Sequence, residues 1–262
     1  MKNSMSIGFV GTGAITAAIV TGFSTEGGPR PSIRLSPRNA ARASDLASRF
    51  DNVSVGVSNQ EVLDSSETVI LAVRPQVAEE VLSELKFPPA QAVISVVAGF
   101  PTRRLASLGV PGDRVWRAIP LPSIAQRRSP TAVYPPGGPA TELFAPLGRV
   151  FEIQVEDHLN AFSTATSTMA AYFGFIGHIA AWVARKGVSE QQAREYMAMM
   201  FAGLADAGLE TSQRSFEDLA EAHATPGGLN AQALRDLTDR GVFEILNEAL
   251  DSVHRRATGQ RL

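Results

Sequence analysis

Short apolar runs alternate with amphipathic segments through the first 158 residues. The runs predict β-strands at 6–10, 33–36, 53–57, 68–73, 92–97, 115–119 and 131–134, with a last edge strand at 151–153. The segments between them predict helices at 14–24, 40–50, 59–63 and 77–85. Strands that alternate with helices form a parallel sheet with crossover helices. The first half is therefore predicted to be an α/β domain.

The pattern changes after residue 158, where β-branched runs disappear and Ala, Met, Leu and Gly recur at helical spacing. This all-α half is predicted to contain helices at 161–186, 189–212, 215–222 and 231–258, with Gly241 as a candidate break in the last. We therefore expect two domains, 1–158 and 159–262. Helix 161–186 combines small residues with a broad apolar surface, which predicts a homodimer or higher homo-oligomer. Packing within one chain is the alternative.

Composition excludes several classes of function. The 262 residues are 44% hydrophobic and 19% charged, as in ordinary globular proteins. A net charge of -2 gives no electrostatic reason to expect nucleic acid or an anionic membrane as a partner. Glycines interrupt the apolar segment 7–20, and no later stretch approaches about 18 uninterrupted apolar residues. We expect no signal peptide and no membrane span, and hence a cytoplasmic protein.

Metal chemistry is also disfavoured. The chain has no cysteine, which excludes disulfides, thiol nucleophiles and cysteine-ligated metals. Its four histidines are scattered, without the spacing of metal ligands. We therefore expect no metal site.

A glycine pair, Gly11-Thr12-Gly13, lies between the first predicted strand and a helix that opens with Ala14 and Ile15. Such a pair lets the backbone turn tightly and approach a pyrophosphate, whose charge then lies at the helix N-terminus. A purely structural turn is the alternative. The position after the first strand of a βαβ unit favours a Rossmann-type, dinucleotide-binding domain.

The second strand ends in Ser36-Pro37-Arg38. NAD sites usually place a carboxylate here, to accept a hydrogen bond from the ribose 2′-hydroxyl. A hydroxyl and a guanidinium suit a 2′-phosphate instead, so we predict NADPH as the cofactor, with Arg42 one helical turn further on as a helper. A solvated Arg38 without a ligand is the alternative.

The sequence resembles the pyrroline-5-carboxylate reductase family over nearly its whole length. Residues 7–13 are similar to the family's opening, and Ser36-Pro37-Arg38 resembles its Ser-Asn-Arg phosphate clamp. Residues 71–76 (Leu-Ala-Val-Arg-Pro-Gln), 94–99 (Ile-Ser-Val-Val-Ala-Gly) and 225–228 (Thr-Pro-Gly-Gly) resemble three further family segments. The resemblance implies NAD(P)H-dependent reduction of a cyclic imine by a Rossmann domain followed by a dimerising helical domain. The cofactor would further contact Ala72, Val73, Arg74, Pro75, Ala98, Gly99 and Pro120.

Departures from the family fall on the substrate side. The family's Met-Pro-Asn-Thr-Pro reads Ile-Pro-Leu-Pro-Ser at 119–123, and its Ser-Gly-Ser-Gly-Pro is matched to Ser-Thr-Ala-Thr-Ser at 163–167. The two threonines that bind the substrate carboxylate in the family are Leu229 and Asn230 here. Backbone N–H groups at a helix start can still hold an anion. The predicted substrate residues are Leu121, Ser163, Thr164, Thr166, Thr225, Gly227, Gly228, Leu229 and Asn230, and helix capping is the alternative role for the hydroxyls.

Hydride transfer to an iminium needs no nucleophile, only correct placement of the nicotinamide. Tyr172 and His223 are weak candidates for a proton donor, and packing or capping is the simpler interpretation of both. The specific substrate stays open between pyrroline-5-carboxylate and a related imine.

Two other functions remain in competition. A 3-hydroxyacid-type dehydrogenase has a similar architecture but needs a lysine base on the long helix. The chain has only three lysines, and Lys186 lies beside Gly187 without the expected asparagine four residues on. A non-catalytic NADP(H)-binding protein is the second alternative, because the substrate segments are altered.

The cofactor prediction can be tested with the variant Arg38→Ala. Loss of the guanidinium should weaken NADPH binding and leave NADH binding nearly unchanged, because only NADPH carries the 2′-phosphate. The measurement is the ratio of the two dissociation constants before and after substitution. An unchanged ratio would contradict the assignment.

Overall fold

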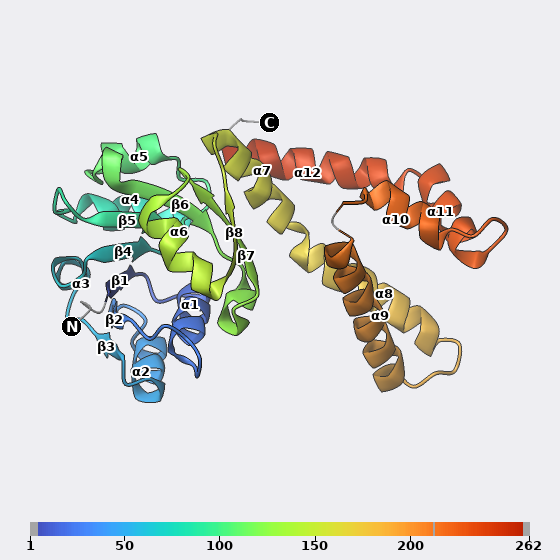
Figure 1. Ribbon diagram of the computed structural model, residues 1–262, viewed down its shortest axis with the longest axis horizontal. Helices are drawn as coiled ribbons and strands as arrows, with labels where there is room; N and C mark the ends of the chain where they lie inside the picture. Colours follow the sequence, from blue (N-terminus) through green and yellow to red (C-terminus); the bar gives the residue numbers. More distant parts are fainter. Residues whose placement is uncertain (1–4, 212, 259–262) are drawn as a thin grey trace. The chain divides into compact units, whose positions relative to one another are not determined.

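The computed structural model describes residues 5–211 and 213–258 (Figure 1). The chain folds into two compact units. The α/β unit extends to Ser163, and the end of the last helix, from Ala257, is grouped with it. The helical unit comprises Thr164–Arg256.

An eight-stranded sheet forms the centre of the α/β unit. Its strands are β1 (Ser6–Val10), β2 (Ser32–Leu35), β3 (Val53–Val55), β4 (Thr68–Leu71), β5 (Ala92–Ser95), β6 (Val115–Ile119), β7 (Ser129–Tyr134) and β8 (Gly148–Glu152). Their order is β3-β2-β1-β4-β5-β6-β7-β8, with β3 to β6 mutually parallel and β7 antiparallel to β6. The predicted α/β fold is confirmed, and the predicted last strand begins earlier, at Gly148.

Helices cover both faces of this sheet (Figure 1). They are α1 (Ala14–Ser24), α2 (Ala40–Arg49), α3 (Asn59–Asp64), α4 (Pro75–Ser83), α5 (Thr102–Ser107) and α6 (Gly138–Phe144). Side chains of α1, α2 and α6 pack in one core with Ile70 and Ile94, while α3, α4 and α5 pack in another with Val69 and Val93. Neighbouring residues of β4 and β5 thus enter opposite cores, so these strands are buried at every position.

Two short helices, α5 and α6, were not predicted. Each has a carboxylate from a distant part of the chain at its first turn. Glu156 accepts hydrogen bonds from the N–H and the hydroxyl of Thr102 at the start of α5, at 2.7 and 2.8 Å. Glu152 accepts them from the N–H of Gly137 and the hydroxyl of Thr141 in α6, at 2.7 and 2.8 Å. Such long-range caps leave no local sequence signal.

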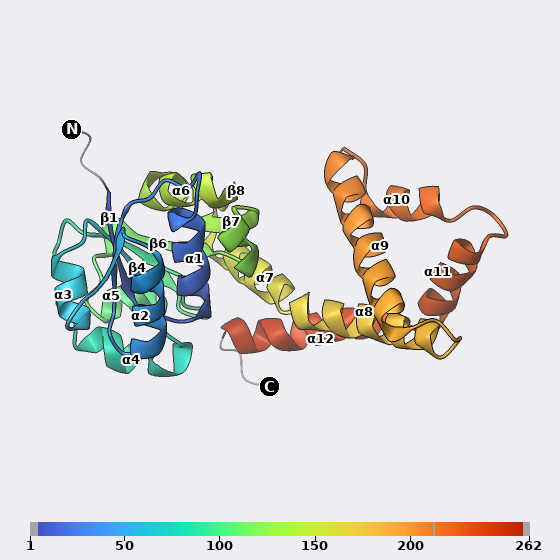
Figure 2. The same cartoon turned by 90° about the horizontal axis from the view of Figure 1, so that it is seen from below.

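The helical unit contains α8 (Thr168–Ala184), α9 (Glu190–Glu210), α10 (Phe216–His223), α11 (Leu229–Asp239) and most of α12 (Val242–Thr258), while α7 (Glu156–Thr166) crosses the boundary between the units. Helices α8 and α9 form a hairpin (Figure 2) in which the ring of Phe201 lies edge-on to Tyr172 and Phe175. The predicted break at Gly241 is confirmed, because this residue has a positive φ of 70°.

The predicted helix 161–186 is wrong in two respects: it begins at Glu156, and it is broken at Ser167. The N–H of Ser167 donates to the carbonyl of Thr164 at 3.0 Å, which is a tighter turn than an α-helix makes. The hydroxyl of Thr168 donates to the carbonyl of Ala165 at 2.7 Å. Competition of hydroxyls for backbone groups explains why this hydroxyl-rich stretch interrupts the helix.

The run Glu156–Ala184 is long and apolar enough to cross a membrane, judged by length and composition alone. The expectation from the sequence was that no segment spans a membrane, because no stretch approaches about 18 uninterrupted apolar residues. None of its most apolar window is buried within the chain. Much of its apolar surface is therefore exposed among the described residues, apart from rings such as Tyr172 and Phe175 that contact α9.

Candidate active site

The carboxyl ends of the central parallel strands meet along one edge of the sheet, because Val10 pairs with Leu71, Leu71 with Ser95, and Ser95 with Arg117. Ligands of open α/β sheets bind at this edge. The segments that leave the strands here contain all the predicted cofactor residues of the α/β unit, namely Gly11, Thr12, Gly13, Ala14, Ile15, Ser36, Arg38, Ala72, Val73, Arg74, Pro75, Ala98, Gly99 and Pro120.

The glycine turn lies against the end of β4. Gly11 has a φ of +104°, and a Cβ on it would lie 2.6 Å from the carbonyl oxygen of Ala72. The hydroxyl of Thr16 donates to the carbonyl of Gly11 at 2.7 Å and closes the turn from the first turn of α1. Gly11 is therefore required by the fold itself.

Gly13 differs, because a Cβ on it would meet nothing within 4 Å. It is the N-cap of α1, without a side-chain cap and without an acidic residue in the first turn. The first N–H groups of a helix have no partner within the helix. Together with the open space, this arrangement fits a pyrophosphate.

Ser36 lies at the end of β2 and is almost fully buried. Its hydroxyl accepts a hydrogen bond from the N–H of Gly11 at 2.9 Å, and the hydroxyl of Thr12 donates to its carbonyl at 2.9 Å. The side chain of Ser36 therefore fastens the glycine turn to β2, and its role as a phosphate ligand stays a prediction.

Arg38 is exposed, and no ion pair joins it to any residue in 5–211 or 213–258. Asn39, which the sequence analysis missed, donates from Nδ2 to the carbonyl of Thr12 at 3.1 Å and is the N-cap of α2. Its place at the start of a predicted helix was the available signal. Asn39 thus fastens the glycine turn, while the side chain of Arg38 is exposed beside it.

The segments after β4, β5 and β6 complete the edge. Arg74 is exposed and is the N-cap of α4, whose first residue is Pro75. Gly99 has a φ of +70°, and Ala98 beside it is exposed. The N–H of Leu121 donates to the hydroxyl of Ser129 at 3.0 Å, which ties the segment after β6 to β7.

The other predicted substrate residues belong mainly to the helical unit. Thr164 is buried, and its hydroxyl pairs with Nδ1 of His254 at 3.0 Å. Ser163 and Thr166 are half-buried on α7. Thr225, Gly227, Leu229 and Asn230 are exposed around the start of α11.

The anion role predicted for the N–H of Gly228 needs correction, because this group donates to the carbonyl of Thr225 at 2.8 Å. Asn230 is likewise engaged, with Nδ2 donating to the carbonyl of His223 at 3.2 Å. Both bonds close the loop that precedes α11. The N–H groups of Leu229 and Asn230 remain at the first turn of that helix.

The two candidate proton donors are His223, the last residue of α10, and Tyr172 on α8. Nδ1 of His223 donates to the carbonyl of Leu219 at 2.7 Å, so a neutral ring carries no proton on Nε2. Tyr172 packs edge-on against Phe173 and Phe201. Neither arrangement favours proton donation over packing and capping.

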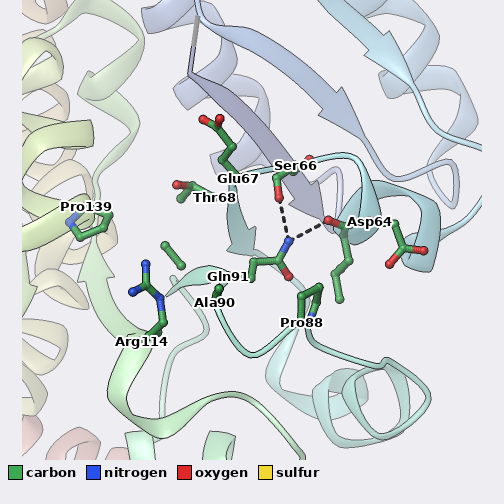
Figure 3. Close-up of a pocket in the computed structure, with 11 residues that line it drawn as sticks. Asp64, Ser66, Glu67, Thr68, Pro88, Ala90, Gln91, Arg114 and Pro139 are labelled. Carbon is green, nitrogen blue, oxygen red and sulfur yellow. Dashed lines mark hydrogen bonds between the residues drawn. The ribbon is translucent and has the colours of Figure 1, made fainter. Parts of the chain in front are cut away.

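A cavity of about 470 Å³ lies at the opposite edge of the sheet (Figure 3). It is lined by the first residues of two strands, Thr68 and Ala92, and by Gln91. Nε2 of Gln91 donates to the carbonyls of Leu63 and Ser66 at 2.7 and 2.8 Å. No predicted site residue lines this cavity.

Comparison with known proteins covers both units. A family model described as "NADP oxidoreductase coenzyme F420-dependent" matches residues 6–99, and one described as "Pyrroline-5-carboxylate reductase dimerisation" matches residues 156–260. Pyrroline-5-carboxylate reductase of Pseudomonas aeruginosa is 25% identical over 96% of this chain and 95% of its own length. That of Methanosarcina acetivorans is 28% identical over 92% of each chain. The crystal structure of 1-pyrroline-5-carboxylate reductase from Streptococcus pyogenes superposes with a TM-score of 0.85, at 26% identity over 98% of this chain and 100% of that one.

Fold and sheet edge together define a Rossmann-type protein with an appended helical unit. The chain belongs to the pyrroline-5-carboxylate reductase family.

The open space at Gly13 makes a specific prediction. An aspartate is a favourable N-cap, so Gly13→Asp should leave the free energy of unfolding unchanged or higher. Its charge should nevertheless repel a pyrophosphate and weaken NADPH binding by about tenfold or more. Thermal unfolding and fluorescence titration measure the two effects. Gly13→Ser, a cap without charge, is the matched control, and equal NADPH affinity of both variants would contradict the placement.

Proposed function

We propose that this chain is an NADPH-dependent oxidoreductase that reduces a cyclic imine, with pyrroline-5-carboxylate as substrate and proline as product. The observation that carries the proposal is the extent of the similarity, which runs through both units and nearly the full length of curated pyrroline-5-carboxylate reductases. The glycine turn and the exposed Arg38 support it independently, because both suit a phosphorylated dinucleotide.

The cofactor-side residues act by binding and orientation. The N-terminal N–H groups of α1 hold the pyrophosphate beside Gly13, and the guanidinium of Arg38 holds the 2′-phosphate. Gly99 lies four residues after the end of β5 and Pro120 directly follows β6, and both would face the nicotinamide at this edge. The bound cofactor supplies a hydride, and the protonated imine accepts it at carbon to become an amine without further proton transfer. This is why the proposal assigns no proton donor.

The first turn of α11 holds the substrate carboxylate in this proposal. Its N–H groups at Leu229 and Asn230 carry the partial positive charge of a helix N-terminus. Asn230 also fixes the preceding loop through its bond to His223. Leu229 then makes the surroundings of that carboxylate more apolar than a hydroxyl at this place would.

The dehydrogenase alternative receives no support from the only lysine in the helical unit. Nζ of Lys186 lies 5.3 Å from the centroid of the Trp182 ring, next to the turn between α8 and α9. The ammonium group is thus engaged with an aromatic ring, and no asparagine follows it four residues on.

Homodimerisation through the helical unit is the second part of the proposal. Large apolar side chains are exposed along α8 and α9, among them Phe173 at 67%. Contiguous exposed apolar surface of this kind marks an interface. A second copy of the same chain accounts for it, and the likeness of residues 156–260 to a dimerisation domain supports that partner.

Reduction can be tested with a panel of cyclic imines, by following NADPH oxidation. Pyrroline-5-carboxylate should be reduced, and the same ring without its carboxylate should have a kcat/KM lower by about tenfold to a hundredfold, because charged hydrogen bonds are lost. A 3-hydroxyacid with NADP⁺ is the control for the dehydrogenase alternative. Tight NADPH binding without turnover of any imine would instead support a non-catalytic binding protein.

Dimerisation can be tested by light scattering after size-exclusion chromatography in buffer without detergent. The protein should have at least the mass of a dimer, and Phe173→Asp should shift it towards the monomer by placing a charge in the interface. Val57→Asp is the matched control, because Val57 is 84% exposed on the α/β unit. A monomeric wild type, or one that needs detergent to stay in solution, would contradict the proposal.

A further inference from the structure

A buried ion pair in the α/β unit lies close to the proposed site but belongs to none of its predicted residues. Arg117 projects from β6 with only 4% of its side chain exposed, and its Nη1 donates to Oε1 of Glu156 at 2.9 Å. Glu156 begins α7 and is 20% exposed. Burying charges is costly unless they are paired and fully hydrogen-bonded, so this pair needs more partners than each other.

Glu156 obtains its further partners from α5. The N–H of Thr102 donates to Oε1 at 2.7 Å, and the Thr102 hydroxyl donates to Oε2 at 2.8 Å. Pro101, the N-cap of α5, has no side chain that can cap the helix, and Glu156 performs that role from another part of the chain. Burial raises the pKa of Glu156, but the bonds from Thr102 and Arg117 lower it further, so the net pKa lies below its ordinary value.

Asn160, one turn along α7, completes the arrangement, with Oδ1 lying 3.5 Å from both Nη atoms of Arg117. We call these four residues, Thr102, Arg117, Glu156 and Asn160, the Glu156 junction. It joins three segments that are far apart in the sequence. All of its members belong to the α/β unit.

Each segment of the junction continues within a few residues into the proposed site. Thr102 follows Gly99 by three positions, and Arg117 precedes Pro120 by three. Ser163 lies about two turns along α7 from Glu156. Because β5 and β6 are neighbouring parallel strands with Ser95 opposite Arg117, the segments after them leave the sheet at the same edge.

An exposed ion pair between α5 and α4 provides a contrast with the buried pair of the junction. Nη2 of Arg104 lies 2.7 Å from Oε2 of Glu79 on α4, but the two side chains are 47% and 64% exposed. Exposed pairs contribute little to stability or position, because solvent screens them. The buried junction, by contrast, adds a constraint on the positions of its three segments.

We propose that Glu156 is a positioning residue for the nicotinamide half of NADPH, acting through Thr102 and Arg117 on the segments 98–99 and 120–121. This inference rests on the proposed function for the identity of the cofactor. Glu156 contacts no reacting atom in this role. The adenosine half depends on the glycine turn and Arg38, which the junction does not touch.

This role predicts that a substitution of Glu156 weakens binding of the nicotinamide half of the cofactor and leaves binding of the adenosine half unchanged. Glu156→Gln should raise the dissociation constant for NADPH and lower kcat by on the order of tenfold to a hundredfold, because misplaced reactants lose catalytic effect. It should leave the dissociation constant for adenosine 2′,5′-bisphosphate unchanged. Glu79→Gln is the matched control and should behave as the wild type. Equal weakening of both ligands would overturn the inference, as would no weakening of either.

Thr102→Val and Thr102→Ser test the same role with a smaller disturbance of the fold. The valine variant loses the hydroxyl bond and should show the same split to a lesser degree, whereas the serine variant keeps the bond and should restore wild-type values. A serine variant as impaired as the valine variant would overturn the inference.

Amide hydrogen exchange in the ligand-free protein separates this inference from the proposed function. Glu156→Gln should speed exchange in segments 98–102 and 118–122 and leave 11–16 unchanged. Unchanged exchange at both segments, or an equal increase at 11–16, would show that Glu156 does not position them. If the wild type reduces no imine yet the exchange pattern and binding split appear, the reductase proposal fails and the positioning role stands.

Discussion

Parallel pairing of β1, β4, β5 and β6 brings their carboxyl ends to one edge of the sheet. The positions of the glycine turn and of the segments after these strands follow from this pairing. Both faces of these strands are buried, so a slip in register would move an apolar side chain from one core into the other. The rigidity of this register places the glycine turn beside Ala72 and the segment after β5 beside that after β6.

Electrostatic groups at this edge fall into two kinds. Some are left open: the start of α1 has no side-chain cap, and Arg38 has no ion-pair partner among the described residues. Others are fully engaged, as in the Glu156 junction and the bond from Ser36 to the glycine turn. The open groups suit an incoming anion, and the engaged groups keep the backbone around it in place. Ligand binding and structural support are thus assigned to different side chains.

The helical unit presents a different physical problem. Among its described hydrophobic residues only Ala193 and Met197 are buried, while large apolar side chains remain exposed on α8 and α9. A unit with so small a core gains little stability by itself from the burial of apolar surface. In the proposed homodimer, association with a second copy supplies the missing burial, so the helical unit is stabilised by assembly.

The sequence by itself determined the alternation of strands and helices, the change to helices after residue 158, the glycine turn and the absence of a carboxylate after β2. These features are local, because apolar period, turn residues and caps act over a few positions. Only the tertiary structure decided the features that join distant residues. The helices α5 and α6 depend on Glu156 and Glu152, and the hydroxyl of Ser36 accepts a hydrogen bond from Gly11. Hydrogen bonds between residues more than ten positions apart have no periodicity, so no local pattern could predict them.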